Sequence, residues 1–162
     1  MTYYTTMNSP VGPLLLTSDG ANLTGVYMTD HERGPGIGRD WVEDSAAAPL
    51  AEAARQLTAY FDGALTQFDL ALAPAGTDFQ KRVWDELTRI PYGLTVSYGE
   101  IAERIGKDPR TASRAVGLAN GRNPISIVVP CHRVIGTKGK LVGYGGGLPR
   151  KEWLLAHEFG NR

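Results

Sequence analysis

The sequence of 162 residues has one cysteine, three histidines and no apolar run long enough to span a bilayer. One cysteine cannot form an internal disulfide, and with three scattered histidines it makes no tetrahedral zinc set. Residues 1–10 lack the basic start and the apolar stretch of a secretory signal. These absences indicate a soluble globular protein, and we expect it in the reducing cytoplasm.

The formal net charge is zero, but the two signs are unevenly distributed. Residues 1–78 carry three basic and ten acidic side chains, whereas residues 79–162 carry fourteen basic and seven acidic ones. A basic half in a neutral protein indicates a polyanionic partner for that half. Uneven surface solvation gives the same pattern, so charge alone leaves both explanations open.

Three strands are expected near the N-terminus, at residues 3–7, 14–17 and 22–28. Asp19-Gly20 between the last two is a strong hairpin signal. Residues 30–46 are polar and glycine-rich without periodicity, which predicts a surface loop.

Helical spacing then predicts a helix over residues 47–62, followed by a short strand at 66–72. The expected inward positions of this helix are Leu50, Ala54, Leu57 and Phe61. The segment A-P-A-G at 73–76 is the candidate linker, because the charge balance changes just after it. We therefore expect two domains, 1–76 and 77–162.

The second half has the start and stop signals of three helices. Thr77 or Asp78 can cap the first, which ends before Pro91. Ser97 to Glu100 form a capping-box pattern that opens the second, and Gly106 ends it. The third begins at Asp108-Pro109. Their expected apolar positions are Phe79, Val83, Trp84, Leu87 and Ile90, then Ile101, Ala102 and Ile105, then Ala112, Ala115, Val116 and Ala119.

The last two of these helices are joined by a short glycine-containing turn, which fits a helix-turn-helix. The second of the pair carries Arg110, Arg114 and small residues suited to a DNA groove. Such pairs also occur without DNA, so the pattern alone does not decide. The expected fold is α+β with two domains. A small N-terminal antiparallel sheet plus helix precedes a mostly helical C-terminal domain with a winged helix-turn-helix-like motif.

Cys131 lies in the apolar run at 127–135, which predicts a buried strand. A free thiol is only a few per cent thiolate at neutral pH, so a nucleophilic cysteine needs a base. Neighbours on a strand point to opposite faces, so His132 can serve only if Pro130 bends the chain or through a water. Glu158 is a candidate to orient the histidine. An inert buried cysteine is the alternative, and at this point both stay open.

A last helix is expected to start at Pro149 and to end near Gly160, with Trp153 and Leu154 inward. The glycine-rich residues 136–147 before it lack the spacing of a phosphate-binding loop.

Several stretches together resemble one family. They are R-A-V-G-L-A-N at 114–120, R-N-P-I at 122–125, I-V-V-P-C-H-R-V-I at 127–135, and G-Y-G-G-G-L with K-E-W-L-L-A-H-E within 143–158. This combination resembles the 6-O-alkylguanine–DNA alkyltransferases, also called methylated-DNA–protein-cysteine methyltransferases. The resemblance is close over residues 77–158. It is looser before that, in S-P-V-G-P-L at 9–14 and A-Y-F-D-G at 59–63.

The resemblance implies direct-reversal DNA repair. The alkyl group of 6-O-alkylguanine, and of 4-O-alkylthymine, would move irreversibly to Cys131, once per molecule. His132 would take the thiol proton through a water, and Glu158 would orient the imidazole. Tyr98 would donate a hydrogen bond to guanine N3, and Asn123 would brace the active-site turn.

The resemblance also implies a base pocket and a DNA-reading helix laid in the minor groove. Arg114 would fill the gap left by the flipped base. The expected DNA-contacting residues are Arg110, Arg114, Ala115 and Gly117. The expected pocket residues are Ser126, Val134, Tyr144, Gly145 and Gly146, with Gly145 standing where several relatives have serine.

Double-stranded DNA is the expected partner, bound by a monomer, with cooperative assembly on DNA left open. No membrane partner and no cofactor are expected. No metal is expected either, because the N-terminal cysteines that hold zinc in some relatives are missing. Two alternatives remain: a non-catalytic module that binds alkylated DNA, and a hydrolase with a Cys–His–Glu triad. The presence of Cys131 disfavours the first, and its adjacency to His132 disfavours the second.

Overall fold

The structure is a computed structural model that describes residues 1–28, 36–136, 139, 144 and 146–161. Its residues group into two compact units. The first comprises Met1–Ala75 and Pro124–Val128, and the second comprises Gly76–Asn123 and Val129–Arg162. The chain thus returns to the first unit at residues 124–128, just before Cys131. A division of the chain at one point after residue 76 assigns these residues to the second domain.

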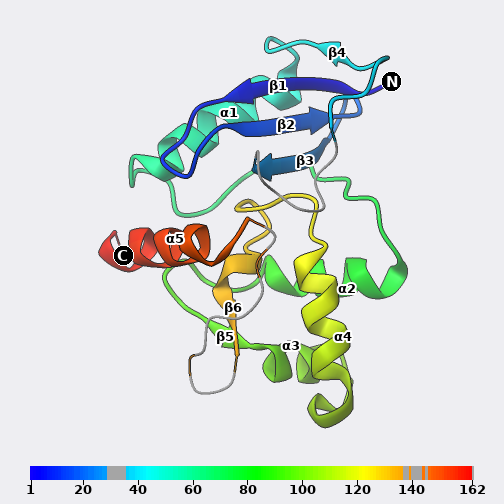
Figure 1. Ribbon diagram of the computed structural model, residues 1–162, viewed down its shortest axis with the longest axis vertical. Coiled ribbons are helices and arrows are strands. Elements are labelled where there is room, and N and C mark those ends of the chain that lie inside the picture. Colours follow the sequence, from blue (N-terminus) through cyan, green and yellow to red (C-terminus); the bar gives the residue numbers. More distant parts are fainter. Residues whose placement is uncertain (29–35, 137–138, 140–143, 145, 162) are drawn as a thin grey trace. The chain divides into compact units, whose positions relative to one another are not determined.

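A four-stranded sheet in the order β3-β2-β1-β4 forms the first unit (Figure 1). Its strands are β1 (Tyr3–Met7), β2 (Leu14–Ser18), β3 (Leu23–Met28) and β4 (Val42–Glu43). The first three confirm the prediction to within one residue, and Gly20 supplies the positive φ of 102° at the turn after β2. β4 was not predicted, because two exposed residues carry no strand pattern.

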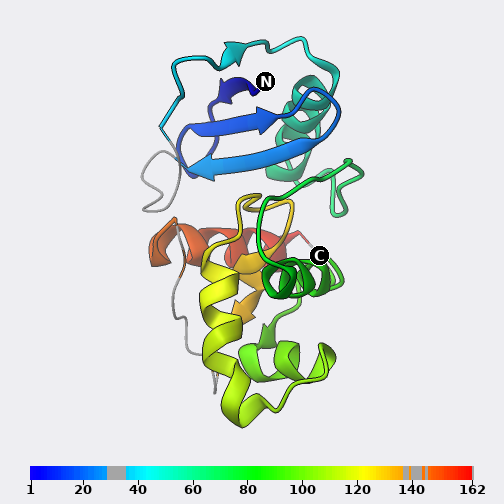
Figure 2. The same cartoon turned by 90° about the vertical axis from the view of Figure 1, so that its right-hand side faces the viewer.

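Helix α1 (Ala48–Phe61) covers one face of this sheet (Figures 1 and 2). Its buried residues are Leu50, Ala53, Gln56, Leu57 and Tyr60. The predicted inward positions Ala54 and Phe61 are only half-buried. The prediction was wrong there because polar Gln56 and amphipathic Tyr60 turn inward. A pattern built from apolar residues alone does not include them.

Residues 66–72 form no strand, which corrects the prediction. The Gln56 carboxamide accepts from Asp69 N and donates to Asp69 O, at 2.9 and 2.8 Å, so a side chain satisfies groups that a ladder would pair. Only Leu72 makes an isolated bridge, to Leu23 of β3. Farther along β3, Val26 bridges Ile125 in the same way.

The second unit is built on α2 (Asp78–Leu87), α3 (Tyr98–Arg104), α4 (Pro109–Gly121) and α5 (Leu148–Gly160). The predicted starts of α2, α3 and α4 are confirmed by their side-chain caps, whereas α5 begins at Leu148, one residue before the predicted Pro149, and has no side-chain cap. Thr77 and Gln80 form a complete capping box, and the Ser97 and Asp108 side chains accept from Glu100 N and Arg110 N.

Helices α2, α3 and α4 pack against one another, as Figure 2 shows. The Trp84 indole N–H donates to Ala119 O at 2.8 Å and joins α2 to α4. Gly106, at φ 79°, ends α3 as predicted. Ala115 is exposed on α4, so its prediction as an inward position was wrong; Val116, Ala119 and Asn120 are the buried residues.

The apolar run at 127–135 is buried but is not a strand, which corrects the prediction. Ile127 has φ 72°, a conformation unusual for a β-branched residue, and Val128 N donates back to Ser126 O. Within this run only β6 (Val134–Ile135) is a strand, and it pairs in parallel with β5 (Val96–Ser97). The turns interrupt the run because backbone groups find partners two residues away instead of across a sheet.

Helix α5 also differs from its prediction in the face it buries. Trp153 is half-buried and stacks on His157 at 4.9 Å, whereas Lys151, Leu154, Leu155 and Glu158 are buried. Across the described residues, no helix has the length and apolar character that crossing a bilayer requires.

Candidate functional site

Cys131 follows a tight turn. Its N–H donates to Val129 O at 2.8 Å, and Pro130 between them has φ −81° and ψ 66°. These values define an inverse γ-turn, which redirects the chain within three residues. The 3-10 helix η1 (Cys131–Arg133) follows directly. The predicted bend at Pro130 is confirmed, and Cys131 is a free thiol that is only 4% exposed.

Two buried asparagines hold this turn. Asn123 Nδ2 donates to Val129 O at 2.8 Å, and Asn120 Nδ2 donates to Cys131 O at 3.3 Å. Side chains at and just beyond the end of α4 therefore fix the position of the thiol, in place of a sheet ladder.

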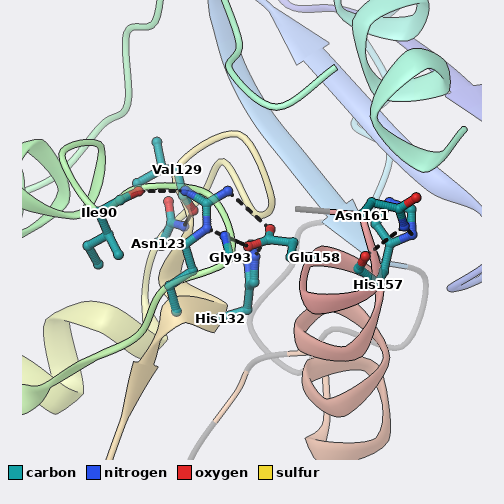
Figure 3. A network of polar contacts seen from close by, with 9 residues as sticks. Ile90, Gly93, Asn123, Val129, His132, His157, Glu158 and Asn161 are labelled. Atoms are coloured by element: carbon teal, nitrogen blue, oxygen red, sulfur yellow. Dashed lines mark hydrogen bonds and ion pairs between the residues drawn. The ribbon is translucent and has the colours of Figure 1, made fainter. Parts of the chain in front are cut away.

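His132 and Glu158 form a fully buried pair. His132 Nε2 lies 2.6 Å from Glu158 Oε2, and Figure 3 shows the carboxylate of α5 directed at the imidazole. The two side chains are 0% and 1% exposed. The other ring nitrogen, His132 Nδ1, has no hydrogen-bond partner within the described part of the chain.

Arg133 completes the cluster from the other side of the carboxylate. Its Nε donates to Glu158 Oε1 at 2.8 Å, its Nη2 to Oε2 at 3.1 Å, and its Nη1 to Ile90 O at 2.6 Å. Gly93 N also donates to Glu158 Oε1, at 3.2 Å. The guanidinium carbon lies 5.6 Å from the ring centroid of Tyr92. The segment after α2 thus cradles both charged groups.

These contacts set the charges of the pair. Burial lowers the pKa of His132 more than Glu158 raises it, and the charges of Arg133 and Lys151 lower it further. Burial alone would raise the pKa of Glu158, but its hydrogen bonds and charge interactions with His132 and Arg133 lower it well below its usual range. At neutral pH the site therefore holds a neutral imidazole beside an ionised carboxylate.

Lys151 is a second buried cation near the sulfur. It is 0% exposed, and its Nζ donates to Val134 O at 2.6 Å. Burial lowers the pKa of Lys151 to about 8. Burial raises the pKa of the Cys131 thiol, while hydrogen bonding with Asn123 and the charge of Lys151 act in the opposite direction.

Tyr98 lies at the start of α3, next to the capping residue Ser97. Its ring is half-buried and faces Gly117 of α4, where an added Cβ would meet ring carbons at 3.8 Å. Burial, and then the Cys131 charge, raise the pKa of Tyr98 to about 12. The phenol therefore keeps its proton at neutral pH and can donate a hydrogen bond.

The predicted DNA-contacting residues lie together on α4. Arg114 and Ala115 are exposed, and Gly117 is half-buried over the Tyr98 ring. Arg110 is exposed and pairs with Asp108 across 3.3 Å.

The predicted pocket residues are more scattered. Val134 is buried, with its carbonyl bound by Lys151, and Tyr144 and Gly146 are half-buried near the start of α5. Ser126 is buried in the first unit. Gly145 lies outside the described residues.

The sequence reasoning missed Arg133 and Lys151 as parts of the site. Charged residues are usually exposed, so neither had been expected to be buried. One signal was available: Lys151 and Glu158 are seven residues apart, which places both on the helix face that also carries Leu154 and Leu155. The described residues hold no group of three or more His, Cys, Asp or Glu side chains suited to a metal ion.

Both halves of the chain match known proteins. Residues 2–74 match the family described as "6-O-methylguanine DNA methyltransferase, ribonuclease-like domain", and residues 78–159 match its "DNA binding domain". The chain is 54% identical over 158 residues to the methylated-DNA–protein-cysteine methyltransferase of Mycobacterium bovis, covering 98% of this chain and 93% of the relative. It is also 54% identical to the enzyme of the same name from Methanosarcina acetivorans, covering 96% and 97%.

Solved structures give the same answer for the fold. The crystal structure of Mycobacterium tuberculosis OGT in complex with DNA has a TM-score of 0.91 and 52% identity, and the match covers 98% of this chain and 94% of that one. With both parts of the family matched along nearly the whole sequence, the chain belongs to the methylated-DNA–protein-cysteine methyltransferase family.

Proposed function

We propose that this chain repairs DNA by direct reversal, taking the alkyl group of 6-O-alkylguanine onto the sulfur of Cys131. One observation carries the proposal beyond family membership. The buried thiol directly precedes a neutral histidine whose Nε2 is held by Glu158 and whose Nδ1 has no partner in the described part of the chain. That nitrogen carries the lone pair of a neutral imidazole, so it can accept a proton.

In the proposed reaction the thiol proton passes to His132 Nδ1, through a bridging water. The sulfur then attacks the alkyl carbon, so that an S–C bond forms as the C–O bond to guanine breaks. Because burial raises the pKa of Cys131, we expect proton removal to accompany attack instead of a standing thiolate.

Tyr98 would assist departure of the base. Guanine leaves with the electron pair of the broken bond, and a hydrogen bond from the phenol to N3 stabilises that charge. The raised pKa of Tyr98 keeps the proton available over the physiological range. The guanine anion then takes up one proton and His132 gives up the one it took from Cys131, so the products are a thioether and neutral guanine.

The helix pair α3–α4 is the proposed DNA-reading element, in the minor groove. Arg114 is exposed on α4 and would occupy the space of the flipped base, while Arg110, Ala115 and Gly117 contact the strand. Flipping costs a few kcal/mol, which an inserted side chain partly offsets. The flipped base would lie against Ser126, Val134, Tyr144, Gly145 and Gly146.

The proposed product is a thioether, which no side chain here can cleave, and the sequence has no second cysteine to resolve it. Each molecule would therefore act once, as a monomer on double-stranded DNA. 4-O-alkylthymine presents the same alkyl–oxygen bond and is a proposed second substrate. A thiol acceptor needs a reducing compartment, which favours the cytoplasm. Residues 1–76 would serve as structural support for residues 77–162.

The test is incubation with a duplex carrying 6-O-methylguanine, followed by mass spectrometry of the Cys131 peptide. We expect a gain of one methyl group, with protein consumed mole for mole, and no gain in the Cys131→Ser control. Binding without a mass change would indicate a lesion-binding module. Repeated turnover of an ester substrate would indicate a hydrolase, and either result would overturn the proposal.

A further inference from the structure

The Glu158 carboxylate is contacted by Arg133, Gly93 and His132. Arg133 donates to both of its oxygens, at 2.8 and 3.1 Å, and Gly93 N donates to Oε1 at 3.2 Å. His132 Nε2 lies 2.6 Å from Oε2. Neither an amide N–H nor a guanidinium can accept a hydrogen bond, so these contacts require acceptor oxygens on Glu158.

This donor shell decides which nitrogen of His132 carries the proton. An ionised carboxylate only accepts, so a histidine nitrogen 2.6 Å from it must be the N–H nitrogen. With Nε2 protonated, a neutral imidazole has its lone pair on Nδ1, the atom without a partner in the described part of the chain. The base proposed for Cys131 thus exists only in one tautomer.

Contacts on several sides fix the position of the Arg133 guanidinium. Its Nη1 donates to Ile90 O at 2.6 Å, its plane lies near the Tyr92 ring, and the side chain is 7% exposed. The planar fork therefore serves Ile90 O and both carboxylate oxygens simultaneously. A lysine carries one nitrogen and cannot reproduce three contacts at fixed angles.

We propose that Arg133 is a positioning residue that keeps Glu158 ionised and thereby fixes His132 in the tautomer with a free Nδ1. The inference rests on the proposed function, because the tautomer matters only if His132 is the base for Cys131. The charged groups facing the imidazole are Glu158 and Lys151 from α5 and Arg133 from η1. Arg133 contacts both carboxylate oxygens of Glu158.

Loss of the guanidinium fork has a defined chemical consequence. Without it Glu158 loses a hydrogen bond at each of its two oxygens and the nearby positive guanidinium, so its proton affinity rises. A protonated Glu158 donates to Nε2, which moves the imidazole proton to Nδ1. The thiol then faces an N–H group instead of a lone pair, and it has no base.

The test is ¹⁵N NMR of histidine-labelled protein, which separates protonated from unprotonated ring nitrogens. His31→Gln and His157→Gln assign the other two histidines. We expect His132 of the unaltered protein to have its proton on Nε2 from pH 6 to 8, and Arg133→Lys to place it on Nδ1 or to mix the two forms. Single-turnover methyl transfer by Arg133→Lys should fall by about a hundredfold, the lower end of what general-base catalysis contributes. Arg89→Lys, at an exposed ion pair, is the matched control and should change neither.

Two results would overturn the inference: a proton on Nδ1 in the unaltered protein, or an unchanged tautomer in Arg133→Lys. The first needs no variant, so the inference stays testable if Arg133→Lys does not fold. Failure of the proposed function is a separate outcome, since the unaltered protein would then gain no methyl group whatever its tautomer.

Discussion

The Lys151 ammonium donates to Val134 O at 2.6 Å and is fully buried, which places a positive charge near the sulfur of Cys131. A buried cation costs free energy unless it is compensated, and the pKa of Lys151 falls to about 8 for that reason. The field of this ammonium favours the thiolate over the thiol.

We expect Lys151→Met to slow alkyl transfer by about tenfold at pH 7, because one unit of thiol pKa corresponds to a factor of ten. The sign of the pH dependence is specific. Lys151 is charged below about pH 8 and neutral above it, so the two proteins should converge in rate as pH rises past 9. Single-turnover rates from pH 6 to 10 measure this, with Lys81→Met, exposed on α2, as control. A rate ratio that stays constant with pH would contradict the electrostatic role.

Arg114→Ala should separate duplex repair from chemistry. If Arg114 fills the space left by the flipped base, its loss raises the free energy of base flipping. An increase of about 1.4 kcal/mol in the barrier slows the reaction tenfold. We expect duplex repair to slow by about tenfold or more, while reaction with the free alkylated base is unchanged. Equal slowing of both reactions would count against the role. Arg89→Ala, an exposed arginine on the segment after α2, serves as the matched control.

Tyr98→Phe should impair only reactions whose leaving group needs a proton donor. The change removes one hydroxyl and keeps the ring contact with Gly117. We expect methyl transfer from 6-O-methylguanine to fall by about a hundredfold. Reaction of Cys131 with a methanethiosulfonate reagent should be unaffected, because its sulfinate leaving group departs as a stable anion. A parallel loss in both reactions would mean that Tyr98 acts through packing.

Much of the fold was predictable because local signals agreed with the final packing. The hairpin turn at Gly20, the caps Thr77, Ser97 and Asp108, and the helix-ending Gly106 all do in the structure what their residue types indicate. The two false strands had strand-like composition, but their backbone groups found other partners. The Gln56 side chain hydrogen-bonds the backbone groups of Asp69, and the backbone groups around Pro130 hydrogen-bond within tight turns.

The residues of the candidate site that belong to a sequence motif were predictable. The charged residues that are part of it only because they are buried were not. Cys131, His132 and Glu158 followed from a recognisable pattern, and the bend at Pro130 followed from proline chemistry. Arg133 and Lys151 did not, because a buried cation is stable only with partners that lie far away in sequence. Ile90 O accepts from Arg133, 43 residues away, and Gly93 N donates to Glu158, 65 residues away.

Stability should depend on Glu158 in a pH window set by its lowered pKa. A carboxyl whose pKa is lowered on folding stabilises the protein above its ordinary pKa of 4.5, and this contribution is lost as pH falls below that value. Glu158→Gln leaves the Arg133 guanidinium buried without a counter-charge, which typically costs about 3–5 kcal/mol. We expect urea unfolding at pH 7 to show that loss, and the gap to the unaltered protein to shrink between pH 4.5 and 3. Asp85→Asn, at an exposed pair with Arg89, should cost less than about 1 kcal/mol at either pH. An equal loss in Glu158→Gln at pH 7 and pH 3 would show that shape, and not charge, is what Glu158 contributes.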